Sequence, residues 1–377
     1  MEKKIFAKAT LAVALAIFSS TAAMGQSKKG KDSTFLDKKW VQELTERIQL
    51  HGYAQGGYNF TQQDGKSQNT FELKRILFWA NAQINDRWSF LFMHDFSSVV
   101  QEFYTDFRVT KNNALTIRLG QFKNGLSLEN PLSPTSMEAI DVYSEGVTYL
   151  TGCGSDPLMG VQYGRDLGLA LFGETNNAKL RYELQVMNGQ GINKKDGNRF
   201  KDVIARIEYR PIKGLNLVAT GQIGQGHSIL AQGNALTPAG VSVYNPAIAP
   251  GENYKRHRWT AGFDYKCKKV KLHGEYLEGY DGPTVSRGGY ITGSVPLGRP
   301  DLEFVGSYDY FNFNTSLGRD QHKAIAGLQY WFYKKCRVQL QYVYKSAYIT
   351  GKSDAATTQF IHGNNHALMC QLQVRFN

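Results

Sequence analysis

Basic side chains at five positions could do the one kind of chemistry that this sequence offers repeatedly, the binding of anions. They are Lys74, Arg75, Arg108, Arg118 and Lys123. The planar guanidinium of arginine donates two parallel hydrogen bonds to an oxyanion, whereas the ammonium of lysine acts as a compact point charge. Such groups help an ion to pass through a channel when they replace part of its hydration shell and bind it weakly enough to release it. Each could equally belong to a lattice of ion pairs that stiffens a wall.

Residue patterns for catalysis are missing from the sequence. There is no GxSxG motif, and the glycines of "GQIGQG" (221–226) do not have the spacing of a dinucleotide-binding or phosphate-binding loop. The histidines His227, His257, His273 and His322 are scattered without metal-ligand pairs at i, i+4, and the four cysteines form no CxxC pair. We therefore expect no enzyme, no cofactor and no metal site. A barrel hydrolase that acts on lipid, with Ser and His on its outer surface, is the enzyme alternative.

The elements that position the basic residues are predicted to be strands. Apolar and polar residues alternate in "IQLHGYAQGGYNF" (48–60), "KDVIARIEYR" (201–210), "RWTAGFDYK" (258–266) and "CRVQLQYVYK" (336–345). A period of two indicates strands with one apolar and one polar face. The polar faces carry charges of both signs, which is typical of a wet interior. This pattern is the weak sequence signature of a transmembrane β-barrel.

The end of the sequence shows this division into an apolar and a polar face most clearly. In "LMCQLQVRFN" the alternating apolar residues run from Leu368 to Phe376, and Gln371, Gln373 and Arg375 fall between them. We predict that the apolar side faces lipid and that the glutamines and the arginine face a lumen. A soluble β-sandwich or propeller is the alternative, but it would not require the second face to be polar.

The first 46 residues are expected to lie outside the barrel. Residues 1–25 combine a basic start with the apolar run "ATLAVALAIF" and small residues, as a cleavable signal peptide does. Residues 26–46 are predicted to be a periplasmic segment with a short helix, and 47–376 to be the barrel. Removing residues 1–25 lowers the formal charge from +12 to +10. An exported basic chain is expected to meet anionic lipid or anionic solutes rather than nucleic acid.

Connection lengths predict the number of strands. Seven short connections, such as "NDR" (85–87) and "KK" (334–335), alternate with eight longer polar ones. The longer ones lie near 61–69, 97–102, 124–158, 189–200, 225–255, 280–286, 314–321 and 350–364. Short periplasmic turns and long outer loops are typical of outer-membrane barrels. The pattern predicts an all-β fold, a sixteen-stranded antiparallel transmembrane β-barrel.

Several segments, taken in order, resemble the phosphate-selective porins O and P. They include "FELKRILFWANAQINDRWSFLFMHDF" (71–96), "LTIRLGQFKNGLSLENPLSP" (115–134), "FKDVIARIEYRP" (200–211) and "GGYITGSVPLGRPDLEFVGSYDYFN" (288–312). The resemblance covers roughly residues 47–376. It implies a homotrimer of barrels in the outer membrane of a Gram-negative bacterium, with a third loop that folds inward and narrows the pore. It also implies selectivity for small anions such as phosphate, through lysines and arginines along the channel.

The basic pair of the family matches Lys74 and Arg75. Strict alternation turns only one of them toward the lumen, and its grouping with Leu73, Leu77, Asn81 and Gln83 favours Arg75. Arg118 shares a polar face with Thr116, Lys123 opens the inward loop, and Arg108 is a candidate ion-pair partner of Asp106.

The third loop argues against strict phosphate selectivity. The segment from Gly125 to Gly146 holds four acidic residues and no Lys or Arg. These acids either pair with arginines of the wall or make the pore less selective for anions. We therefore expect an outer-membrane porin that passes small hydrophilic solutes by passive diffusion, with a modest preference for anions. The alternative is a non-conducting barrel that acts as an adhesin or a structural anchor.

Overall fold

A computed structural model describes residues 47–63, 65–156, 158–229, 248–249, 251–350 and 359–376. The predicted signal peptide and periplasmic segment (1–46) lie outside these residues. The strands that form the barrel are β1 (Ile48–Gln63), β2 (Lys66–Gln83), β3 (Trp88–Asp95), β4 (Val100–Arg108), β5 (Thr116–Lys123), β8 (Arg165–Glu174), β9 (Leu180–Met187), β10 (Asp202–Tyr209), β11 (Leu215–Ile223), β12 (Gln225–His227), β13 (Asn253–Lys266), β14 (Lys271–Asp281), β15 (Thr284–Pro296), β16 (Leu302–Asn312), β17 (Asp320–Tyr333), β18 (Cys336–Thr350) and β19 (Gln359–Phe376).

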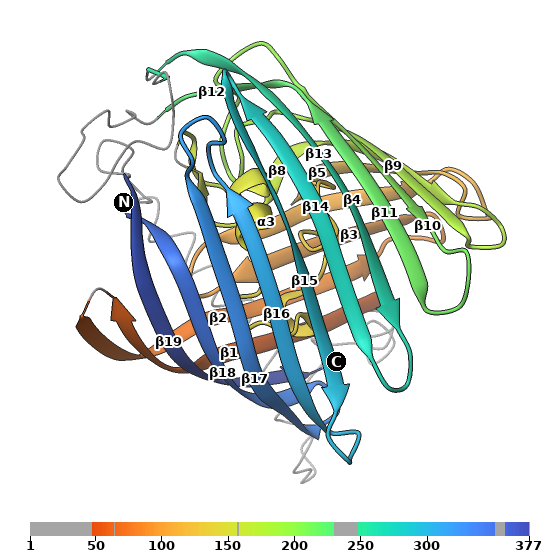
Figure 1. The fold of residues 1–377 in the computed structure, drawn as a ribbon. Helices are drawn as coiled ribbons and strands as arrows, with labels where there is room; N and C mark the ends of the chain where they lie inside the picture. Colours follow the sequence, from red (N-terminus) through yellow and green to blue (C-terminus); the bar gives the residue numbers. More distant parts are fainter. Residues whose placement is uncertain are drawn as a thin grey trace, which may run out of the picture. The chain divides into compact units, whose positions relative to one another are not determined.

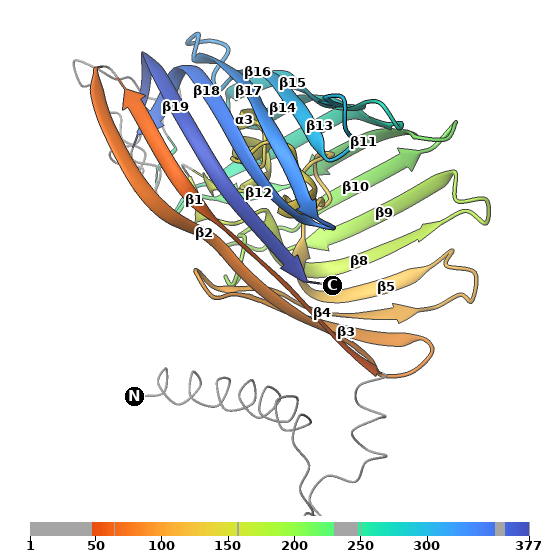
Figure 2. The same ribbon diagram turned by 90° about the horizontal axis from the view of Figure 1, so that it is seen from below.

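The strands close into one antiparallel ring (Figure 1). Each strand pairs with the next along the chain, and β1 also pairs with β19, which closes the barrel. The short β12 continues β11, because both pair with β13. Counted as one strand, they make the ring sixteen-stranded. The order from β2 to β11 can be followed in Figure 2. The predicted sixteen-stranded barrel is confirmed.

The final strand shows what lies on each side of the wall. Leu368, Leu372 and Phe376 are 46%, 48% and 51% exposed, whereas Gln371 and Gln373 are 1% and 0% exposed. Gln371 Nε2 donates to Gln339 Oε1 of the neighbouring strand over 2.9 Å. Glutamines that are buried and bonded on one face, opposite bare apolar groups on the other, fit a polar interior inside an apolar exterior. The predicted division of the closing strand into an apolar outer face and a polar inner face is therefore confirmed.

Two connections that were predicted to be long are tight turns. Only residues 64–65 separate β1 from β2, and only 282–283 separate β14 from β15. Gly65 and Gly282 have φ angles of +79° and +58°. Because glycine adopts positive φ without a steric penalty, it allows two-residue hairpins there. The Asp-Gly pairs at 64–65 and 281–282 were the sequence signal, and the polar residues around them extend the strands instead.

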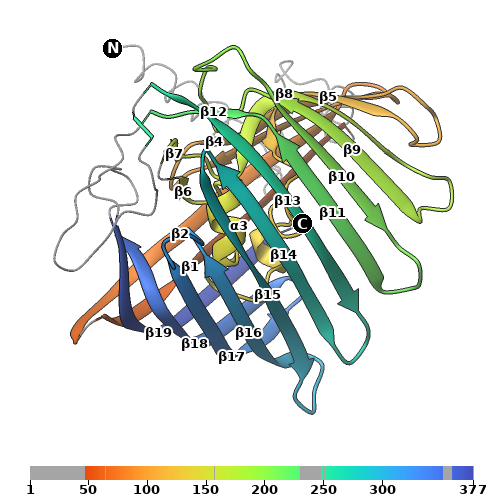
Figure 3. The ribbon, with the colours of Figure 1, turned by 45° about the horizontal axis from the view of Figure 1, so that its top comes forward.

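The segment between β5 and β8 contains small elements of its own. They are the 3-10 helix η2 (Pro134–Ser136), the helix α3 (Glu145–Thr151) and the short strands β6 (Ser155–Asp156) and β7 (Gly160–Val161). The Ser144 hydroxyl accepts a hydrogen bond from the Val147 N–H and so caps α3 at its start. Figure 3 shows α3 behind β14 and β15. Among the described residues, no helix is both long and apolar enough to cross a membrane.

Apolar contacts hold α3 against the wall. Val147 and Leu150 of the helix are fully buried and belong to the same cluster as Leu277, Tyr290 and Phe311 of β14, β15 and β16. An aliphatic side chain of this size contributes about 1.5–3 kcal/mol when it is fully buried. The segment is therefore fixed against β14–β16 by packing as well as by polar contacts.

Candidate channel

A cavity of about 560 Å³ lies between the segment after β5 and the wall strands β1–β5, β8–β11, β13 and β19. Seven of its lining side chains are basic and four are acidic. The basic residues are Arg118, Lys123, Arg165, Arg181, Arg206, Arg210 and Arg375, and the acidic ones are Glu102, Glu183, Glu208 and Asp264. The excess of positive groups raises the local concentration of anions, because low-dielectric walls focus their field.

The exposure of these cations differs. Arg165 pairs with Glu102 over 2.9 Å, and Arg206 pairs with Glu208 over 2.8 Å, and these four side chains are at most 11% exposed. Arg181 and Arg210 keep 41% and 38% of their side-chain surface accessible, although each also has an acidic neighbour. Arg181 and Arg210 are therefore the guanidinium groups of this lining that are best placed to meet a passing ion.

A β-bulge turns both members of the basic pair inward. The register between β1 and β2 pairs Gln55 with Arg75 but Gly56 with Leu73, which leaves Lys74 as the extra residue. Arg75 Nη1 donates to Gln55 Oε1 over 2.9 Å, while Lys74 Nζ lies 3.6 Å from Asp141 in the segment after β5. The expectation that only one of the two faces inward is therefore wrong, since alternation fails at a bulge. Leu73 is 59% exposed, on the outer face.

Arg118 and Arg108 also differ from the expected arrangement. Arg118 binds both carboxylate oxygens of Asp106, at 2.7 and 2.8 Å, and its guanidinium lies 3.8 Å from the centre of the Tyr104 ring. Asp106 is therefore the partner of Arg118, not of Arg108 as suggested. Arg108 is exposed in a second cavity, of about 340 Å³, which also contains Arg87 and Arg181.

Lys123 anchors the start of the segment after β5. Its Nζ donates to the carbonyl oxygens of Asn130 at 2.8 Å and Leu132 at 2.6 Å. A lysine that satisfies two backbone carbonyls holds the chain in a bend, because those carbonyls would otherwise lack partners. The structure thus brings Arg118 and Lys123 to the same cavity, whereas Lys74, Arg75 and Arg108 do not line it.

Two acidic residues of the segment lie beside lysines of the wall. Glu145 lies 3.2 Å from Lys323 of β17 and 2.7 Å from Lys345 of β18. Burial by itself raises the pKa of the Asp141 carboxyl, but the ammonium groups of Lys323, Lys345 and Lys74 outweigh it and hold the pKa below its ordinary value. The partners are lysines rather than the wall arginines that were considered. The wall lysines therefore offset the charge of both carboxylates.

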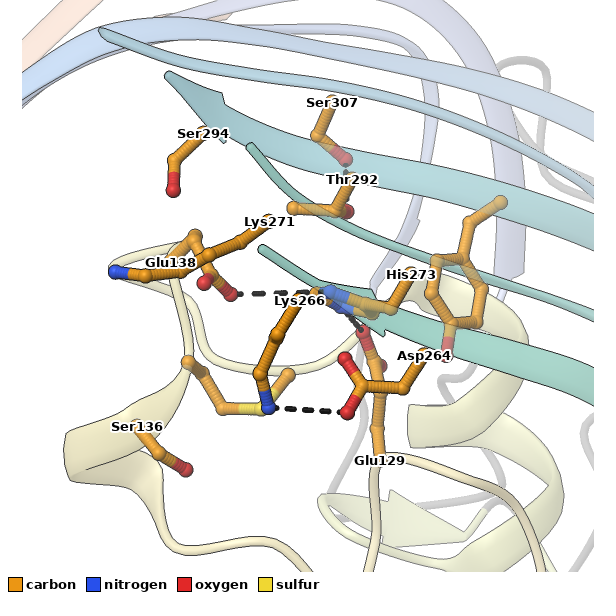
Figure 4. A network of polar contacts seen from close by, with 12 residues as sticks. Glu129, Ser136, Glu138, Asp264, Lys266, Lys271, His273, Thr292, Ser294 and Ser307 are labelled. Carbon is orange, nitrogen blue, oxygen red and sulfur yellow. Dashed lines mark hydrogen bonds and ion pairs between the residues drawn. The ribbon is translucent and has the colours of Figure 1, made fainter. Parts of the chain in front are cut away.

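The other two acids of the segment, Glu129 and Glu138, both lie beside His273 (Figure 4). His273 Nε2 lies 3.2 Å from Glu129 Oε1, and His273 Nδ1 lies 3.8 Å from Glu138 Oε2. Next to them, the Ser127 hydroxyl donates to Glu275 Oε2 over 2.7 Å. All five side chains are buried. None of the four acidic residues between Gly125 and Gly146 lines the main cavity.

Arg181 and Arg210 were not singled out from the sequence. The alternation in "LRYELQVM" (180–187) places Arg181, Glu183 and Gln185 on one face, which the structure turns toward the cavity. Nothing in the alternation indicates which inward arginine remains accessible. That depends on where the segment after β5 lies, and its contacts are made by residues far apart in the chain.

Comparisons with known proteins identify the fold. The anion-selective porin from Comamonas acidovorans aligns with a TM-score of 0.62 at 12% identity, over 87% of this chain and 99% of that one. OmpF of Salmonella typhi, in complex with daunomycin, aligns with a TM-score of 0.58 at 13% identity, over 87% and 97%. OmpT of Vibrio cholerae aligns with a TM-score of 0.56 at 14% identity, over 87% and 97%.

Sequence comparisons add nothing to this result. No protein-family model matches the chain, and no curated protein sequence matches it. The resemblance to phosphate-selective porins O and P therefore remains a prediction. At identities this low, structural likeness shows the fold alone. The described part of the chain has the barrel fold of the bacterial porins.

Proposed function

We propose that this chain is an outer-membrane porin of a Gram-negative bacterium that passes small hydrophilic solutes by passive diffusion and prefers anions. A closed ring of strands satisfies its backbone hydrogen bonds between neighbours, so it is one of the two structures that can stand in a bilayer. The apolar exterior and polar interior of β19 fit that environment. The role needs no catalytic group.

The observation that carries the anion preference is the separation of charges across the lumen. Glu145 and Asp141 face lysines of the wall, and Glu129 and Glu138 face His273. The cavity on the other side of the segment keeps an excess of arginines, of which Arg181 and Arg210 are the most accessible. Acids that are paired with basic residues of the wall repel an anion in the cavity only weakly.

We also propose that residues 124–158 narrow the channel. Gln339 Nε2 and Gln341 Nε2 of β18 both donate to the Glu138 carbonyl oxygen, at 2.8 and 2.7 Å. Arg337 Nη2 donates to the Met137 carbonyl oxygen over 2.5 Å. Gln339 and Gln341 lie within β18 and not at its ends, which supports a segment that crosses the lumen instead of standing above it.

Phosphate selectivity and trimerisation are finer parts of the proposal. The accessible arginines suit oxyanions, since a guanidinium fork matches two oxygens. Each has a carboxylate nearby, Glu183 for Arg181 and Glu208 for Arg210, which favours a modest anion preference over a strict phosphate site. A homotrimer is proposed on the family resemblance, and one of the OmpT structures is described as a trimer form.

Liposome swelling tests the channel itself. Proteoliposomes that contain the purified chain are expected to swell in isotonic solutions of neutral sugars, at rates that fall as the sugar becomes larger, because the route is a restricted aqueous one. Liposomes with heat-denatured protein serve as the control. An absence of swelling with correctly folded barrel would favour the adhesin or anchor instead.

A further inference from the structure

Apolar side chains from two neighbouring strands face the main cavity. They are Leu77 and Trp79 of β2 and Leu91 and Met93 of β3. Inward-facing side chains of channel-forming barrels are normally polar, because they meet water. The four residues therefore form an apolar stripe, a name we keep for them, where hydration alone would favour polar groups.

The segment after β5 extends the stripe from the other side. Leu128, Pro131, Leu132 and Pro134 line the same cavity. Trp79 is held in place by ring contacts with His51, at 5.1 Å between ring centres, and with Tyr53, at 6.2 Å. These ring contacts hold the Trp79 indole in a defined position within the apolar surface.

Charged groups lie across the cavity from the stripe. Arg181 lies on β9, and Arg210 comes directly after β10. In the ring, β3, β4, β5, β8 and β9 separate β2 from β10. A solute between them meets the apolar stripe on one side, where the Arg375 guanidinium lies 5.6 Å from the centre of the Trp79 ring, and the accessible guanidinium groups of Arg181 and Arg210 on the other. A simple inorganic ion uses only the second.

Two buried polar atoms in the lining have no protein partner among the described residues. They are the hydroxyl of Tyr53, whose residue is 4% exposed, and Oδ1 of Asn216. Buried polar atoms normally have a hydrogen-bond partner. The cavity volume of about 560 Å³ is also within the range of about 300–1,000 Å³ that is usual for small-molecule sites.

We propose that this cavity is a selectivity site for organic anions that carry an apolar ring beside a carboxylate. The inference rests on the proposed porin function and names its preferred solute class. The ring lies against the apolar stripe, where it leaves water, and the carboxylate faces Arg181 and Arg210. Removing about 40 Å² of ring surface from water favours such a solute about fivefold over a carboxylate without a ring.

Block of the chloride current in planar bilayers tests this preference with the unmodified protein. Sodium benzoate and sodium acetate are added at neutral pH, where both are fully ionised. We expect the half-blocking concentration of benzoate to be about fivefold lower than that of acetate. Equal half-blocking concentrations in a channel that conducts chloride with anion preference would overturn the inference and leave the porin function standing. A protein that forms no channel would overturn the porin function instead.

A double variant assigns the effect to the stripe. In Leu91→Ser/Met93→Ser the difference between benzoate and acetate is expected to disappear. In Arg181→Ala/Arg210→Ala both carboxylates should block less, while their ratio stays above one. A benzoate preference that survives in the folded serine variant would place the ring elsewhere and contradict the assignment.

Discussion

Replacing Arg181 and Arg210 together by alanine is expected to lower the anion-to-cation permeability ratio roughly sevenfold, because the two charges attract an anion and repel a cation by the same amount. Each charge at about 7 Å from an ion in water contributes about 0.6 kcal/mol, and screening at 0.1 M salt reduces this by about half. Arg181 and Arg210 are the most accessible guanidinium groups of the cavity. The reversal potential in a salt gradient measures the ratio, and its change should shrink as the salt concentration rises.

Arg299→Ala is the matched control for this result. Arg299 lies in the short turn between β15 and β16, its side chain is 58% exposed, and it does not line the cavity. Its removal changes the net charge by the same amount per site and is expected to leave the permeability ratio unchanged. If the double variant kept the parental ratio, or if Arg299→Ala lowered it equally, the selectivity would not reside at Arg181 and Arg210.

Glu145→Gln is expected to release the segment after β5 from the wall. The Glu145 carboxylate forms ion pairs with Lys323, whose side chain is 3% exposed, and with Lys345, whose side chain is 21% exposed. The variant leaves Asp141 and Asp309 as the acidic neighbours of the buried Lys323, and removing one partner of a buried ion pair costs about 3 kcal/mol. Opening of this segment should then become about 100-fold more frequent. Amide hydrogen exchange of residues 139–151 measures it, while β14–β16 should keep their protection.

Glu72→Gln makes the same chemical change in a more exposed ion pair. Glu72 lies 3.2 Å from Lys74, and its side chain is 33% exposed. A partly exposed pair contributes at most about 1 kcal/mol, so exchange in 139–151 should change by less than about tenfold. Equal exchange in the parent and in Glu145→Gln would show that the apolar packing of α3, and not the ion pairs, fixes the segment.

The ring of strands could be predicted from the sequence because its main requirement is local. A strand with one face in lipid and one in water must alternate, and β10 does so: Arg206 and Glu208 are buried inside, while Ile207 is 54% exposed outside. The alternation repeats in each strand without reference to the rest of the chain. The turn lengths were a weaker guide, since glycines at positive φ shortened two connections that were expected to be long.

The arrangement of the site could not be predicted in the same way. The bulge at Lys74 depends on how β1 and β2 fit each other, and it moves the next residue to the opposite face. The partners of Glu145 come from β17 and β18, almost two hundred residues away along the chain. Whether an inward arginine is accessible or neutralised depends on such distant contacts, so the sequence gives the candidates without their roles.

The most direct test of the porin account is the reversal potential of the unmodified protein in a planar bilayer with a tenfold gradient of potassium chloride. A channel lined by an excess of basic groups should be more permeable to chloride than to potassium, and the potential should move toward zero when the salt concentration is raised at a constant ratio, because the charges become screened. A reversal potential of the sign for potassium selectivity, or no conductance from folded barrels, would contradict the account.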